Sequence, residues 1–236
     1  PELGAPLLRA RFARAYVDPN REAFELDAAL FDGLPDHVNA ASARARAGLG
    51  TIPSRIGGED IYRWRLPFDE AEERVRLAYW PYHQALQGLI GQTRATFGTA
   101  LLLDCHSMPS LGPNGAAATE GAIDFALGDR FGRSCSPLIV ERVEATLARH
   151  GFRVARNRPY AGGHITARYG RPDTDVHALQ IEIRRGLFME EKTRRPNGAM
   201  ARLQEVIREL LLEIGWFMAK RLTPAPLSPG WLRTAS

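Results

Sequence analysis

The stretch LLLDCHSMPS, residues 101–110, determines how the rest of the chain is interpreted. Its apolar run, which begins at Ala100, predicts a buried strand that ends at Asp104, and the Ser-Met-Pro sequence that follows breaks the strand pattern. Asp104 and His106 are two residues apart, so their side chains point the same way on an extended chain. A carboxylate and an imidazole at a strand end are suited to metal binding or water activation. On spacing alone, a histidine that only bonds a loop carbonyl is an equally good interpretation.

Strands and helices are predicted to alternate along the chain. Apolar runs predict further strands at residues 14–17, 152–157 and 178–183. Helical periodicity and capping residues predict helices at residues 69–96, with a kink or split at Pro81, and at residues 136–150 and 200–221. Residues 33–60 hold seven glycine or proline positions and are expected to form a long loop. Strands separated by helices indicate an α/β sheet with helices on both faces, where a ligand sits beyond the carboxyl ends of the strands.

Composition limits the class of protein. The chain has 236 residues, 44% hydrophobic and 25% charged, which is typical of soluble globular proteins. We expect a single domain over residues 1–236, with a loosely held tail at residues 223–236. No apolar run approaches the roughly 20 residues that span a bilayer, and two cysteines cannot form a disulfide framework, so a cytoplasmic protein is expected. The net charge is +4, but the basic residues are scattered among acids, so neither a membrane nor nucleic acid is an expected partner.

A second candidate site, DPNR at residues 18–21, follows the strand predicted at residues 14–17. Asn20 and Arg21 could hold a substrate carboxylate, since arginine offers a planar fork of donors and asparagine an adjustable amide. Asp-Pro-Asn is also ordinary turn chemistry. Composition alone favours the turn.

A third candidate is Glu182, in the predicted strand ALQIEI. Gln180, Glu182 and Arg184 share one face of this strand, and a leucine and two isoleucines occupy the other. A glutamate is costly to bury unless it is paired or functional. Glu182 is therefore either a general base beside a metal-bound water or an edge-strand residue paired with Arg184 or Arg185.

Other catalytic signatures are missing from the sequence. It has no G-x-S-x-G elbow, and the glycine-containing stretch at residues 160–172 lacks the context of a phosphate-binding loop. Cys105 could be a nucleophile beside His106, but adjacent strand residues face opposite ways, so a core position is favoured. No His-x-x-x-His pair occurs, so a complete three-ligand zinc site is not visible, although His164 and His177 could reach the site.

The chain resembles the N-formylglutamate amidohydrolase family in stretches that follow the family order and cover most of residues 1–200. The matching stretches are AYVDPNRE, GLGTIP, IYRWRLPFDEAE, LLLDCHSMPS, GDRFGRSCSP and YAGGHITARYGRP running into HALQIEIRRGLFMEE. The resemblance implies the zinc carboxypeptidase and aspartoacylase-like group, with a three-layer α/β/α fold and a mixed, mostly parallel sheet. It also implies hydrolysis of an N-formyl or N-acyl amino acid, above all N-formyl-L-glutamate to formate and L-glutamate in histidine degradation.

The resemblance further implies which residues act on a metal and on water. In that group an Asp-x-His at a strand end supplies a zinc ligand, here His106 supported by Asp104, and a late-strand Glu is base and proton shuttle, here Glu182. The family carries an N-terminal Pro-His-Ser-Gly-type motif and a further acidic residue for the remaining ligands, and nothing corresponding precedes Pro1. We therefore expect Zn²⁺ or another divalent transition metal, with the other ligands in a missing N-terminal segment.

The implied substrate site completes the set of candidates. An Asn-Arg pair binds a substrate carboxylate in that group, here Asn20 and Arg21. Further substrate contacts are expected from Ser107, His177 and Arg185, and Arg185 or another arginine could meet the side-chain carboxylate. The expected partner is a small anionic N-acyl amino acid. Alternatives are a related zinc amidohydrolase with another N-acyl substrate, a metal-free binding protein that kept the fold, and an arginine-rich nucleic-acid binder.

Overall fold

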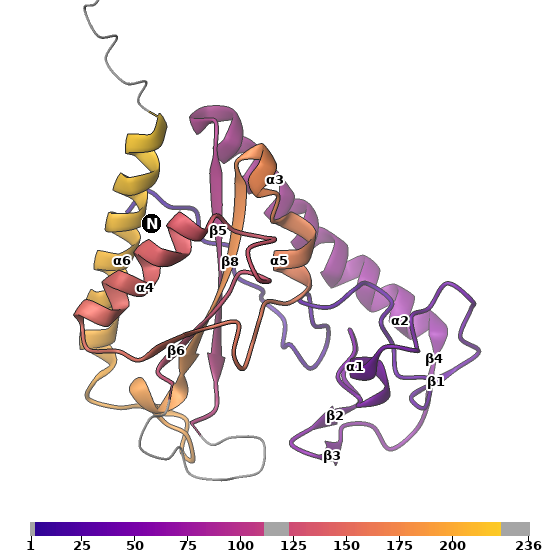
Figure 1. Cartoon of the computed structure of the whole chain (residues 1–236). Helices are drawn as coiled ribbons and strands as arrows, with labels where there is room; N and C mark the ends of the chain where they lie inside the picture. Colours follow the sequence, from indigo (N-terminus) through magenta and orange to yellow (C-terminus); the bar gives the residue numbers. More distant parts are fainter. Residues whose placement is uncertain (1–2, 111–122, 223–236) are drawn as a thin grey trace, which may run out of the picture.

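A four-stranded mixed sheet forms the centre of the computed structural model, which describes residues 3–110 and 123–222 (Figure 1). In spatial order its strands are β5 (Ala100–Met108), β8 (Val176–Arg184), β6 (Phe125–Gly128) and β7 (Val154–Arg156). β5 and β8 are parallel from the Ala100–Val176 pair to the Met108–Arg184 pair. β6 is antiparallel to β8 and parallel to β7. The predicted mixed sheet is confirmed, and the strand predicted to end at Asp104 continues to Met108.

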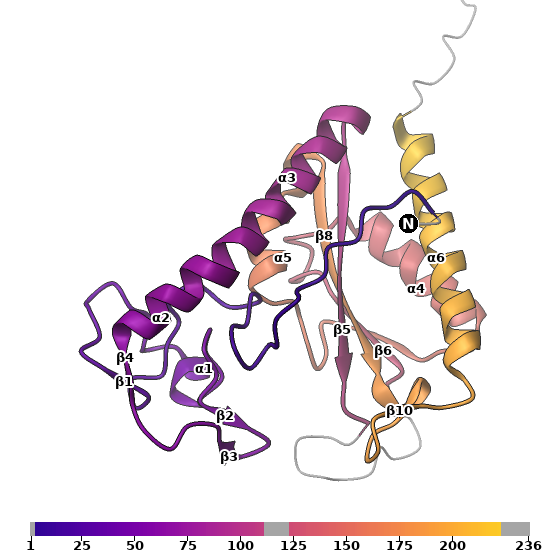
Figure 2. The ribbon, with the colours of Figure 1, turned by 180° about the vertical axis from the view of Figure 1, so that it is seen from behind.

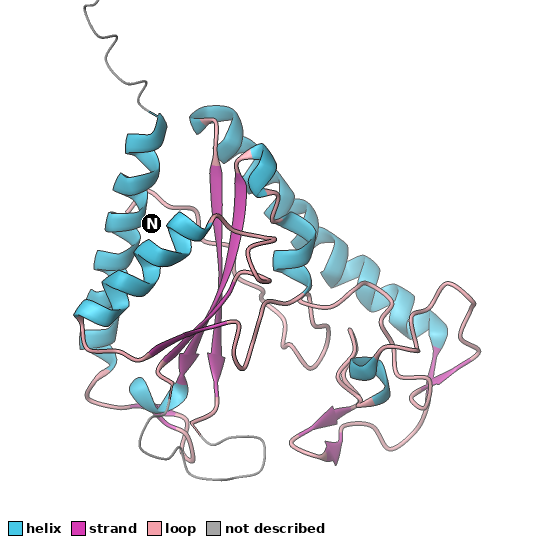
Figure 3. Cartoon of the chain, viewed as in Figure 1, coloured by secondary structure: helices cyan, strands magenta, loops and turns pink. Residues whose placement is uncertain are grey.

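Helices cover both faces of this sheet (Figure 3). On one face, α4 (Pro137–Arg149) and α6 (Met200–Leu222) pack with the apolar side chains of β6 and β8 into the largest core cluster. On the other face, α3 (Trp80–Phe97) and α5 (His164–Tyr169) enclose a smaller cluster that includes Leu102 of β5. The α/β class predicted from the alternation of elements is therefore confirmed.

The helical run that ends in α3 is interrupted where proline predicts it. α2 (Phe68–Arg74) passes through a π-helical turn, η1 (Val75–Tyr79), before α3 begins. Pro81 lacks a backbone N–H and its ring crowds the carbonyl four residues earlier, and a widened turn relieves that crowding. Gly98 then ends α3 in the left-handed conformation, at φ 73°.

The segment before α2 forms short elements around two small apolar clusters. They are β1 (Phe31–Asp32) paired with β4 (Leu66–Pro67), β2 (Arg55–Ile56) paired with β3 (Glu59–Asp60), and the four-residue helix α1 (Ala43–Arg46). Residues 14–17, predicted as a strand, are wrongly assigned, because the Tyr16 N–H donates to the carbonyl of Ala13 and closes a turn. In the view from behind, the N-terminal segment crosses β5, and Leu8 joins the cluster that contains Leu102 (Figure 2).

Short elements also follow α5 and β8. They are η2 (Pro172–Thr174), η3 (Arg185–Leu187), β9 (Met189–Glu190) and β10 (Arg195–Pro196). Within residues 3–110 and 123–222, no helix has the length and apolar character needed to cross a membrane. The tail predicted at residues 223–236 lies outside the described residues.

Candidate active site

Asp104, His106 and Glu182 meet on one face of the sheet, where β5 and β8 run side by side. His106 Nε2 lies 2.9 Å from Asp104 Oδ1, so both side chains point the same way, as their spacing predicts. Glu182 stands opposite His106 in the register of the two parallel strands. The site therefore takes its imidazole and its two carboxylates from neighbouring strands, near their carboxyl ends.

The environment shifts the pKa values of two of these groups. Burial lowers the pKa of His106, but the hydrogen bond and charge of Asp104, together with the charge of Glu182, raise it overall. Burial raises the pKa of Glu182, and the charge of His106 and a hydrogen bond from Gln180 offset part of that rise. A carboxylate with a raised pKa is better matched to proton transfer near neutral pH.

Asn20 reaches this cluster from the DPNR loop. Its Nδ2 lies 3.3 Å from Asp104 Oδ2 and 3.1 Å from His106 Nε2. Its Oδ1 accepts a 2.8 Å hydrogen bond from the backbone N–H of Ile165 at the start of α5, which fixes the orientation of the amide. Asn20 is buried and its amide is engaged within the protein, so it positions His106; its predicted contact with substrate stays a prediction.

The DPNR loop is both a turn and part of the site. Asp18 Oδ1 accepts a 2.9 Å hydrogen bond from the Asn20 N–H, which is an Asx-type turn. Arg21 donates from Nε to the Leu49 carbonyl at 2.9 Å and from Nη1 to the Asn20 carbonyl at 2.8 Å. Burial lowers the pKa of Arg21, against the charge of Asp18. The sequence left two interpretations of DPNR, a turn or a binding site. In the structure the turn itself brings Asn20 to His106.

Gln180 is a member of the cluster to which the sequence assigned no role. Its Oε1 accepts a 2.8 Å hydrogen bond from the Gly163 N–H, and its Nε2 donates to Glu182 Oε1 at 2.9 Å. The signal available in the sequence was the alternation of β8, which places Gln180 and Glu182 on one face.

Ser107 and Arg185 lie together, just beyond this cluster. Arg185 Nε donates to Ser107 Oγ at 3.2 Å at the carboxyl ends of β5 and β8, where Ser107 is exposed and Arg185 is half-buried. By strand alternation, Ser107 and Cys105 point away from the face that carries His106. The core position favoured for Cys105 is wrong, because this residue is exposed on β5, which is an outer strand of the described sheet.

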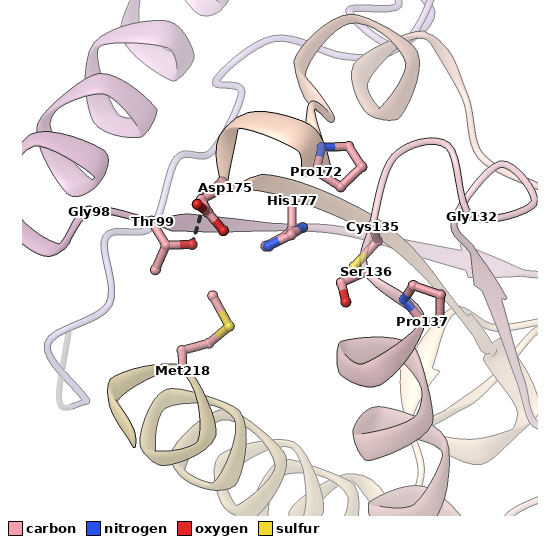
Figure 4. A pocket seen from close by; sticks show the side chains of 10 residues that line it. All are labelled: Gly98, Thr99, Gly132, Cys135, Ser136, Pro137, Pro172, Asp175, His177 and Met218. Atoms are coloured by element: carbon pink, nitrogen blue, oxygen red, sulfur yellow. Dashed lines mark hydrogen bonds between the residues drawn. The ribbon is translucent and has the colours of Figure 1, made fainter. Parts of the chain in front are cut away.

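His177 does not lie with the other candidates. It pairs with Leu101 near the beginning of β8, about 17 Å along the strand from Glu182 at 3.3 Å per residue. Figure 4 shows it lining a cavity of about 460 Å³ together with Thr99, Cys135 and Met218. This position, at the other end of β8 from Glu182, does not support the expectation that His177 contacts the same substrate, which rested on its proximity to the glycine-containing stretch at residues 160–172.

The described residues fit a metal ion only in part. A metal-binding histidine commonly gives its second ring nitrogen to a carboxylate, which is the arrangement of His106 and Asp104. However, no three His, Cys, Asp or Glu side chains within the described part of the chain form a group that could hold a metal. Among the described residues, His106, hydrogen-bonded to Asp104, is one candidate metal ligand, and Glu182 lies opposite it. These residues do not make a complete set of metal ligands.

Comparison with known proteins is consistent across sequence and structure. A family model described as N-formylglutamate amidohydrolase matches residues 1–189. N-formylglutamate deformylase of Pseudomonas aeruginosa is 34% identical over 219 residues, which are 90% of this chain and 74% of that protein. The enzyme of the same name from Pseudomonas putida is 34% identical over 195 residues, which are 80% of this chain and 66% of that protein.

Two solved structures share the fold. The crystal structure of N-formylglutamate amidohydrolase from Ralstonia eutropha JMP134 has a TM-score of 0.83 at 37% identity, over 89% of this chain and 76% of that one. A gene product of Agrobacterium tumefaciens has a TM-score of 0.57 at 20% identity, over 87% and 70% of the two chains, and supports the fold alone. The range matched by the family model contains Asn20, His106 and Glu182.

Proposed function

The chain belongs to the N-formylglutamate amidohydrolase family, and from this premise we propose that it hydrolyses N-formyl-L-glutamate to formate and L-glutamate. The observation that carries the proposal is the placement of Glu182 opposite His106 on two parallel strands, with Asp104 and Asn20 behind the imidazole. Ligands of open α/β sheets bind at the carboxyl ends of such strands.

Glu182 is the proposed general base. It takes a proton from a water molecule, whose oxygen bonds to the formyl carbon. The bond between that carbon and nitrogen then breaks, and the proton passes from Glu182 to the departing amine, so that formate and the free amino acid leave. The raised pKa of Glu182 favours the first half of this transfer, because the carboxylate binds the proton from water more readily than an ordinary glutamate would.

A metal cofactor is part of the proposal. Zinc or another divalent transition metal would be held in part by His106, with Asp104 fixing the imidazole. When bound, such an ion polarises the formyl carbonyl and lowers the pKa of its water to about 7. We also propose that helices on both faces of the mixed sheet represent the three-layer, zinc-carboxypeptidase-like arrangement.

The substrate proposed here carries two carboxylates, and two arginines of the chain are candidates to bind them. Arg21 with Asn20 would hold the α-carboxylate, and Arg185, beside Ser107, would meet the side-chain carboxylate. A role in histidine degradation and a cytoplasmic location are proposals that rest on the family alone.

The test is formate release from N-formyl-L-glutamate by the purified chain, with and without added Zn²⁺. Glu182→Gln should lower turnover at least about 100-fold, because it removes the base and preserves the shape of the side chain. Glu205→Gln, an exposed position on α6, is the matched control and should leave turnover unchanged. Metal content, measured by elemental analysis, should be the same in all three proteins.

Each outcome separates one part of the proposal from the others. Near-normal turnover in Glu182→Gln would remove that residue from the role of base. Faster release of acetate or succinate from the matching N-acyl amino acids would assign the protein to a related amidohydrolase. If no substrate is hydrolysed and no metal is retained, the chain is a binding protein with this fold.

A further inference from the structure

Gln180 connects the proposed base to the N-cap residue of α5, Gly163. Its amide accepts from the Gly163 N–H at 2.8 Å and donates to Glu182 Oε1 at 2.9 Å. The backbone N–H of Gly163 can only donate, so Oε1 of Gln180 must face it and the NH₂ end must face Glu182. The direction of both hydrogen bonds is therefore fixed by the protein.

Stability alone does not call for a glutamine at this position. Gln180 is buried in β8, and its backbone is paired on both sides, with Asp104 of β5 and Gly128 of β6. A hydrogen bond between buried groups adds only about 0.5–1.5 kcal/mol net to stability, and burying the amide itself is costly unless such bonds are made. However, the Gln180 amide binds one oxygen of the buried Glu182 carboxylate and so restricts the rotation of that carboxylate.

The same N-cap residue also contacts the other half of the site. A Cβ at Gly163 would stand 2.4 Å from Asn20 Oδ1, so the Asn20 amide packs directly against this residue. Asn20 in turn contacts His106 Nε2 at 3.1 Å. Gly163 thus lies between two chains of contacts, one leading through Gln180 to Glu182 and one through Asn20 to His106.

We propose that Gln180 is a positioning residue that holds the Glu182 carboxylate in the orientation required for proton transfer, an inference that rests on the proposed role of Glu182 as general base. Gln180 does not touch the substrate. It acts through Glu182, and its loss leaves the base present but free to rotate.

Two variants test this in the full chain. Gln180→Met keeps the approximate size and removes both hydrogen bonds, and Gln180→Asn keeps a buried amide that is one methylene too short to span both partners. Both should lower kcat for formate release from N-formyl-L-glutamate about 10- to 100-fold, the usual effect of losing a group that orients a catalytic residue, with KM unchanged. Gln204→Met, at an exposed position of α6, is the control and should leave both constants unchanged.

A double variant separates positioning from a general structural defect. If Gln180 acts through Glu182, then Gln180→Met should cause no further loss in a Glu182→Gln background. Wild-type kcat in both single variants would overturn the proposal, and so would losses that multiply in the double variant. If the wild-type chain itself releases no formate, the proposed function fails, and that result is distinguishable from a failure of Gln180 alone. Circular dichroism melts identify any variant that does not fold.

Discussion

Gly163 shows how closely the site depends on single atoms. The residue lies at the N-terminus of α5, where Asn20 Oδ1 and Nδ2 are 2.4 and 2.6 Å from the position of a Cβ. Real Cβ atoms do not approach other atoms so closely, so any side chain there must displace Asn20. Because Asn20 is held on its other side by the Asp104 and His106 side chains, the displacement is transmitted to the imidazole.

Gly163→Ala is therefore expected to lower formate release from N-formyl-L-glutamate about 10-fold or more, through the altered position of His106. The matched control is Gly91→Ala, where a Cβ on the exposed side of α3 would meet nothing within 4 Å. That control should keep full activity and gain about 0.5–1 kcal/mol in the free energy of unfolding, because alanine favours a helix. Steady-state kinetics and urea unfolding measure both effects. Full activity in Gly163→Ala would show that Asn20 does not position the imidazole.

At the scale of elements, α3 holds the DPNR loop in place. His83, buried in α3, makes a 3.0 Å hydrogen bond from Nε2 to the Pro19 carbonyl, and its Nδ1 accepts from the Tyr169 hydroxyl at 2.7 Å. Tyr79 donates from its hydroxyl to the Arg21 carbonyl at 2.8 Å. Since the carbonyl of Pro19 can only accept, the neutral imidazole satisfies both partners of His83.

This arrangement predicts a loss of stability in mild acid. Burial lowers the pKa of His83 to about 4, from an ordinary value of 6.5, and nearby His164 and Arg168 act in the same direction. As the pH falls, the unfolded chain therefore binds a proton at His83 before the folded chain does. The contribution of His83 to the free energy of unfolding is complete above pH 6.5 and is lost as the pH falls from 6.5 to 4. The loss is at most about 3.5 kcal/mol, at about 1.4 kcal/mol per pKa unit.

Urea unfolding of the wild type and of His83→Gln between pH 4 and 7 measures this contribution. Glutamine can donate to Pro19 and does not titrate, so the variant should lose less stability on acidification than the wild type. His37→Gln, at an exposed position, should retain the pH dependence of the wild type. Parallel pH curves for the wild type and His83→Gln would mean that His83 titrates with an ordinary pKa.

The elements themselves were largely predictable from local patterns. The apolar run before Asp104 predicts β5, and the alternation of polar and apolar residue types around Glu182 predicts β8; both are nine-residue strands, long enough to show these patterns. β6 was not predicted, because it has four residues that are all buried and therefore shows no alternation. Residues 14–17 look like a strand but form a turn, because no neighbouring strand pairs with them in the described part of the chain.

Across the molecule, the contacts of the site that the sequence could not predict are those between residues far apart in the chain. Spacing alone places Asp104 beside His106, but the hydrogen bond between Asn20 and Ile165 joins residues 145 positions apart. Such contacts depend on how the sheet, α5 and the N-terminal loops pack, and no local pattern encodes them. For the same reason the sequence did not show that β8 carries His177 and Glu182 to different ends of the sheet.

A metal ion bound at His106 would stabilise the whole fold. A ligand that binds only the folded state stabilises it, by about 2.7 kcal/mol at 100 times its dissociation constant. If a divalent metal binds at His106, a chelator should lower the melting temperature of the wild-type chain and abolish formate release, and added Zn²⁺ should restore both.

His106→Gln should melt at the same temperature with and without chelator, because it lacks the imidazole that Asp104 orients. His37→Gln should respond to the chelator as the wild type does. A melting temperature and a rate of formate release that chelator leaves unchanged in the wild type would exclude a metal at His106, and Glu182 would then have to act on water without one.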